Sequence, residues 1–98
     1  MSLCTPEVVL LPSPRLSWRV LAGEVVILHP EAGTLHRLND TGTAVWELLD
    51  GTRDIGTIAA MLADEFEVTV EVAIVELGIL AEELLEAGLV EISSVVLS

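Results

Sequence analysis

Histidines and carboxylates are the residue types in this 98-residue chain that can do chemistry. His29 and His36 fall on neighbouring predicted strands, and two imidazoles can begin a metal site, but the sequence places no third ligand beside them. Paired carboxylates act as general acid and base where they converge in a pocket, whereas the glutamates here occupy solvent-facing helix positions. No serine has the spacing of a nucleophile elbow, and no glycine-rich phosphate loop is present. The sequence therefore predicts neither an enzyme nor a bound cofactor or metal.

The charge balance narrows the partner classes further. Sixteen acidic residues stand against four arginines and no lysine, for a net charge of −12. Because phosphate binding depends on cationic side chains, we expect no nucleic-acid partner. Acidic residues also interrupt every apolar run before it reaches the roughly 18 to 20 residues that a membrane-spanning helix needs, so we expect no membrane partner. The single cysteine, Cys4, leaves no internal disulfide, and we expect a cytoplasmic protein.

The first half of the folded region reads as three strands. Two apolar segments flank Ala22-Gly23, where glycine suits the positive φ of a two-residue hairpin turn. That register pairs Val20 with Val25 and Trp18 with Ile27 on the face that we expect to meet the core. A third strand follows a four-residue turn and would form an edge of the sheet. The predicted strands are Leu16–Leu21, Glu24–His29 and Thr34–Leu38.

Three helices follow, each preceded by a residue that can cap its N-terminus. These caps are Asn39, Asp54 and Thr69, and glycines at 51 and 88 suit the left-handed conformation at helix ends. Apolar residues at i, i+3, i+4 and i+7 mark the face that each helix buries. The predicted helices cover residues 40–50, 55–66 and 70–87. Trp46 is expected at the margin of the core, and residues 89–92 are expected to return as a short strand.

This order of elements predicts an α+β fold of the winged helix-turn-helix type, in which a three-stranded antiparallel sheet is followed by three helices (βββααα). Residues 1–15 are expected to be a flexible N-terminal segment and residues 93–98 a C-terminal tail. The folded domain then covers residues 16–92.

The third predicted helix has more apolar surface than one core face can bury. At about 100° per residue, Val72, Val75 and Ile79 point away from the buried face and alternate with glutamates. Beside this helix we expect the third strand, whose outer N–H and C=O groups have no partner. An open strand edge next to an apolar helix face forms a groove that can accept an extended peptide as an added strand.

Five segments stand in a specific order and spacing along the chain: 38–52, Ile58-Ala59, Phe66-Glu67-Val68, 80–84 and 86–90. In that order they resemble the PqqD family, and the resemblance extends over nearly the whole chain, from Leu16 to Ile92. It implies a RiPP recognition element, a module that binds the leader of a ribosomally synthesised precursor peptide and presents it to a modifying enzyme. Such an enzyme would be a radical SAM enzyme, a leader protease or a cyclase, in pyrroloquinoline quinone synthesis or in a lasso-type or other modified-peptide pathway.

The resemblance also implies where the leader binds, because the leader in this family is similar to a strand added to the third strand and held against the third helix. On the strand, the matching positions are Thr34, Leu35, His36, Arg37 and Leu38. On the helix, the apolar stripe and its neighbouring carboxylates are Val72, Val75, Glu76, Ile79 and Glu83.

Two other functions are compatible with a winged-helix topology. A DNA-binding winged helix requires basic residues on its third helix, and residues 70–87 contain five glutamates and no basic residue. A structural domain that forms a homodimer through the apolar stripe stays open as the alternative. A tight dimer that hides the stripe and ignores leader peptides would favour this alternative.

Overall fold

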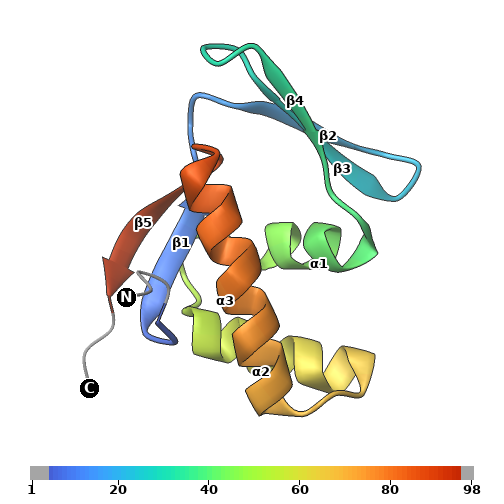
Figure 1. Ribbon diagram of the computed structural model, residues 1–98, viewed down its shortest axis with the longest axis vertical. Helices are drawn as coiled ribbons and strands as arrows, with labels where there is room; N and C mark the ends of the chain where they lie inside the picture. Colours follow the sequence, from blue (N-terminus) through green and yellow to red (C-terminus); the bar gives the residue numbers. More distant parts are fainter. Residues whose placement is uncertain (1–4, 96–98) are drawn as a thin grey trace.

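Residues 5–95, which a computed structural model describes, form five strands and three helices in the order ββββαααβ. The strands make two antiparallel sheets, β1–β5 and β2–β3–β4. In Figure 1 the two-stranded sheet lies along α3, and the three-stranded sheet stands beyond α1. The elements are β1 (Val8–Pro12), β2 (Ser17–Leu21), β3 (Glu24–His29), β4 (Thr34–Arg37), α1 (Asp40–Leu48), α2 (Ile55–Phe66), α3 (Val70–Glu86) and β5 (Val90–Val95).

The β2–β3 hairpin has the predicted register. Ala22 and Gly23 have φ angles of 52° and 81°, the pair of positive values that a two-residue turn between twisted strands requires. Val25 and Ile27 are fully buried, so the predicted core face is confirmed for β3. For β2 it is wrong, because their partners Val20 and Trp18 are 47% and 44% exposed. Trp18 packs edge-on against Trp46, with ring centroids 5.8 Å apart. Trp46 is itself buried, and the prediction that it lies at the core margin is wrong because Trp18 covers it.

The sheet formed by β1 and β5 is the main difference from the predicted fold. Strand β1 lies within residues 1–15, so the prediction that this whole segment is flexible is wrong, and βββααα is not the order of the chain. Strand β5 reaches Val95, so the predicted tail begins inside a strand. The physical reason is burial: Val8, Val9 and Leu10 are all inside the core, where their apolar surface is removed from water. Cys4 and residues 96–98 lie outside the described residues.

The packing of β1 makes a prediction about stability. Leu10 has no exposed surface, so replacing it with alanine should leave a cavity and lower the free energy of unfolding by about 2–5 kcal/mol. Urea denaturation followed by circular dichroism measures this loss. Leu11 is only half-buried, so Leu11→Ala is a matched control with a smaller expected loss. An unchanged unfolding midpoint for Leu10→Ala would show that β1 does not contribute to the core.

All three predicted helix caps are confirmed. Each helix begins directly after its cap, whose side chain accepts a backbone N–H three residues further on. The donor–acceptor distances are 2.8 Å for Gly42 N–H to Asn39 Oδ1, 2.7 Å for Thr57 N–H to Asp54 Oδ1 and 3.2 Å for Val72 N–H to Thr69 Oγ1. Helix α1 ends at Leu48, two residues earlier than predicted, because the ψ angle of 77° at Leu49 takes the chain out of the helix.

The core lies between the helices and both sheets. Its most deeply buried side chains come from β1, β3, α1, α2 and the residue that precedes β5, so segments far apart in sequence share one interior. These side chains are Leu10, Val25, Ile27, Val45, Trp46, Ile55, Ile58 and Leu89. Among the described residues, no helix combines the length and the apolar character needed to cross a membrane.

Candidate functional site

Strand β4 has an open edge. It pairs with β3 on one side, and no strand within residues 5–95 pairs with it on the other. The Leu38 N–H donates to the Val25 carbonyl across the same ladder, at 2.9 Å. Because hydrogen-bonded and non-hydrogen-bonded pairs alternate in an antiparallel ladder, His36 belongs to a bonded pair and directs its N–H and C=O toward β3. The N–H and C=O groups of Leu35 and Arg37 therefore point outward, where an added strand can meet them.

The side chains of β4 leave this edge accessible. Leu35 is 69% exposed, and it lies on the outer face of the sheet opposite Leu28. Arg37 Nε lies 3.4 Å from Glu24 Oε1, so its charge is held on that outer face. The structure thus places four of the five predicted strand residues on the open edge, and the fifth, Leu38, lies just beyond the strand and packs against the core.

The two histidines of the sheet do not converge on a metal. They lie on the same face, but the Ala32 N–H donates to His29 Nδ1 at 3.2 Å, and His36 Nε2 lies 3.0 Å from Thr34 Oγ1. No group of three or more histidine, cysteine, aspartate or glutamate side chains is placed to hold a metal ion within residues 5–95.

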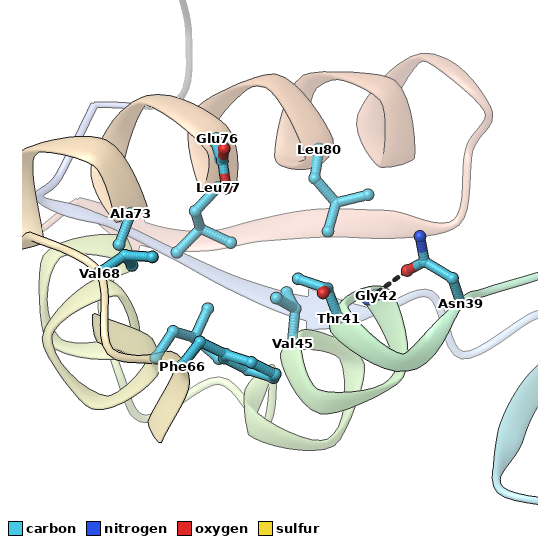
Figure 2. A pocket seen from close by; sticks show the side chains of 11 residues that line it. Asn39, Thr41, Gly42, Val45, Phe66, Val68, Ala73, Glu76, Leu77 and Leu80 are labelled. Atoms are coloured by element: carbon cyan, nitrogen blue, oxygen red, sulfur yellow. Dashed lines mark hydrogen bonds between the residues drawn. The ribbon is translucent and has the colours of Figure 1, made fainter. Parts of the chain in front are cut away.

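A pocket of about 250 Å³ opens where α1, the end of α2 and α3 meet (Figure 2). From α3, Leu77 and Leu80 point across it toward Thr41 and Val45 of α1. Phe66, the last residue of α2, lies at one end. The lining is therefore mainly aliphatic and aromatic, with the size of one large side chain, and it suits an apolar anchor.

Polar groups stand at the margins of this pocket. Asn39 lies at the end opposite Phe66, and its Oδ1 accepts the Gly42 N–H at 2.8 Å (Figure 2). The cap therefore fixes the Asn39 amide and leaves its Nδ2 group to donate toward a guest. Glu76 contributes a carboxylate from α3. A guest in this pocket would meet an apolar interior, the amide of Asn39, the hydroxyl of Thr41 and the negative charge of Glu76.

The open edge and the pocket are adjacent along the chain. Asn39 follows the last residue of β4 by two positions, so the chain passes directly from the open edge to the lining of the pocket. The edge offers backbone partners, and the pocket offers space for a side chain.

The predicted helix residues divide into two groups. Glu76 lines the pocket, whereas the other four predicted residues of α3 do not. Val72, Val75 and Ile79 are 44%, 63% and 56% exposed and form a solvent-facing stripe beside it. The sequence missed the pocket because Leu77, Leu80 and Phe66 fit the periodicity of a core face, and periodicity does not show how far apart two helices stand. The sequence did contain one signal for the pocket, the two apolar residues Phe66 and Val68 on either side of Glu67 at the end of α2.

An open-edged antiparallel sheet joined to three helices, with a pocket at the sheet-to-helix junction, defines the class of α+β domain to which this chain belongs. The family model described as coenzyme PQQ synthesis protein D (PqqD) matches residues 24–90. The chain therefore belongs to the PqqD family. The match begins at β3 and ends at the start of β5, so it includes β4 and all three helices.

Two curated relatives and one solved structure are similar to this chain. A PqqA binding protein of Klebsiella pneumoniae (strain 342) is 44% identical over 52 residues, which cover 53% of this chain and 54% of that protein. A PqqA binding protein of Kluyvera intermedia is 36% identical over the same lengths. The chain thus spans about half the length of the curated relatives it matches. The structure of TbiB1 in complex with the TbiA(beta) leader peptide has a TM-score of 0.77 and 25% identity, covering 83% of this chain and 94% of that one.

Proposed function

We propose that this protein is a non-catalytic module that binds the leader of a ribosomally synthesised precursor peptide by strand addition and presents it to a modifying enzyme of the same pathway. The observation that carries the proposal is the open β4 edge that leads into an apolar pocket. Strand addition supplies backbone hydrogen bonds, and the pocket supplies selection for a side chain. The relatives support it, since two are PqqA binding proteins and one was solved with a leader peptide.

The proposed contact surface joins the edge to one side of α3. It contains the β4 residues, the pocket and the predicted helix positions, with the exposed stripe as the rim over which the peptide passes. We also propose the winged helix-turn-helix class for the β2-to-α3 region, where three strands precede three helices. The cytoplasmic location stays a prediction.

Titration of labelled peptides tests the proposed function. PqqA, the TbiA(beta) leader and peptides selected from a displayed library of random 16-residue sequences are each titrated by fluorescence anisotropy. We expect at least one of them to bind with micromolar or tighter affinity. Apolar burial then outweighs the free-energy cost of association and of ordering the peptide. If neither PqqA, nor the TbiA(beta) leader, nor any library peptide binds at protein concentrations up to about 100 μM, the proposed function is wrong.

The rim residues provide a prediction of their own. Ile79→Glu should weaken the binding of the same peptide by about tenfold, equivalent to about 1.4 kcal/mol, because a charge replaces an apolar contact. Ile79 is 56% exposed, so the fold should be retained. Met61, a 41% exposed apolar residue of α2, gives the matched control, and Met61→Glu should leave affinity unchanged. Equal affinities for the two variants would remove the stripe from the site.

A homodimer through the apolar stripe is the second candidate function. The observation that favours it is the exposure of Val72, Val75 and Ile79 along one helix, which forms a self-complementary patch if two copies meet about a two-fold axis. Sedimentation velocity separates the candidates, because a dimer that is broken by Val75→Glu and shows no response to peptides fits only the second.

A further inference from the structure

The carboxylates beside the pocket are arranged in a line. Glu76, Leu80 and Glu83 follow one another at i, i+4 and i+7 on α3, so they share one face of the helix. Glu76 and Leu80 line the pocket, and Glu83 is exposed one turn further on. The helix contains five glutamates and no basic residue. A large apolar side chain of the protein thus sits between two carboxylates at the place where a guest would enter.

Within the part of the chain that the structure describes, Glu76 and Glu83 have no cationic partner. Among residues 5–95, neither Glu76 nor Glu83 takes part in an ion pair. Three of the four arginines are paired elsewhere, Arg15 with Glu31, Arg37 with Glu24 and Arg53 with Asp50. The fourth, Arg19, lies on β2, and β3 separates it from the open edge of β4. The net charge of −12 adds a long-range field of the same sign.

The spacing of Glu76, Leu80 and Glu83 along α3 is shorter than the side-chain repeat of an extended peptide, but of the same order. Every second side chain of a strand points to the same side, at a repeat of about 6.6–6.8 Å. Four residues of helix advance about 6.0 Å and three advance about 4.5 Å. Where a peptide runs along α3 with one side chain beside Leu80, its neighbours two positions away lie within about 1 Å of the level of Glu76 and about 2 Å of the level of Glu83, a difference that a long lysine or arginine side chain can span. On α3 an apolar side chain stands between two carboxylates. A peptide with an apolar side chain between two cations would complement it.

We infer that the site selects extended peptides in which a large apolar residue has lysine or arginine two positions away. This inference rests on the proposed peptide-binding function and specifies the chemistry of the guest. The apolar side chain enters the pocket between Leu80 and Val45, whose volume of about 250 Å³ accommodates one residue from leucine to tryptophan in size. The cation remains at the surface and pairs with Glu76 or Glu83.

Three synthetic peptides test the inference. Each is a 12-residue, N-acetylated and C-amidated sequence of threonine and valine with one central leucine, and the positions two residues before and after the leucine are both lysine, both glutamine or both glutamate. At about 50 mM salt we expect the lysine peptide to bind about tenfold more tightly than the glutamine peptide and about a hundredfold more tightly than the glutamate peptide. The preference should shrink at about 500 mM salt, because the pairs are exposed and are screened.

Charge-reversed variants show whether the effect is local. The double variant Glu76→Lys and Glu83→Lys should prefer the glutamate peptide. The matched control is Glu47→Lys with Glu65→Lys, two exposed carboxylates of α1 and α2 outside the pocket lining, which changes the net charge by the same amount. We expect this control to retain the preference for the lysine peptide.

The outcomes separate the inference from the function on which it rests. Equal binding of the three peptides to the unaltered protein overturns the inference, and so does a control variant that reverses the preference as strongly as the pocket variant. If PqqA, the TbiA(beta) leader or a library peptide still binds in either case, the proposed peptide-binding function stands, but the preference for lysine or arginine two positions from the apolar residue does not. If none of those binds either, both are wrong.

Discussion

Replacement of Leu35 with proline is expected to weaken peptide binding by about a hundredfold, or about 2.7 kcal/mol, while the protein stays folded. The Leu35 N–H points away from β3, so proline removes a group that only an added strand would use. The proline ring also projects its Cδ into the space that the added strand must occupy. Edge strands tolerate proline at such positions. Fluorescence anisotropy with a bound peptide measures the loss.

Two control variants isolate the backbone contribution at this position. Leu35→Ala keeps the N–H and removes only an exposed side chain, so its affinity should fall by less than about threefold. His36→Pro removes an N–H that faces β3 and should lower the unfolding midpoint. Equal loss of affinity in Leu35→Pro and Leu35→Ala would mean that the side chain, and not the strand edge, contacts the peptide.

Leu80→Glu is the second substitution with a large expected effect. It places a carboxylate inside the apolar pocket. A guest side chain that enters the pocket must then remove water from this charge, which costs free energy. We expect peptide affinity to fall by about a hundredfold. Isothermal titration calorimetry measures the affinity, and a thermal melt shows whether the partly buried position still supports the fold.

A shape-conserving change at the same position is the control for this effect. Leu80→Met keeps an apolar side chain of similar volume, so its affinity should remain within about threefold of the unaltered protein. A folded Leu80→Glu variant that binds peptide as tightly as Leu80→Met does would remove the pocket from the binding site.

Local sequence signals predicted the sheet β2–β3–β4 and the helices well. The glycine of the Ala22-Gly23 turn fixed the hairpin register, and polar caps fixed the starts of the helices at Asn39, Asp54 and Thr69. Each of these signals acts over a few residues, so it can be recognised without knowing the tertiary structure. The open edge of β4 followed from the same reasoning, because no further strand was predicted beside it.

The features that the sequence could not show depend on distant contacts. Strand β1 pairs with β5, roughly eighty residues away, and its run of buried valine and leucine lacks the alternation that marks a half-buried strand. The pocket depends on the gap between α1 and α3, and residues such as Leu77 and Leu80 have the same spacing whether that gap is filled or open. Tertiary packing, and not local propensity, decides both features.

Amide hydrogen exchange of the protein with and without a saturating bound peptide tests strand addition to β4 most directly. We expect the Leu35 and Arg37 amides to exchange quickly in the unbound protein and to become protected in the complex, while the His36 amide is protected in both. Unchanged exchange at Leu35 and Arg37 when the peptide is bound would contradict the account, because the peptide would then be held somewhere other than the open edge.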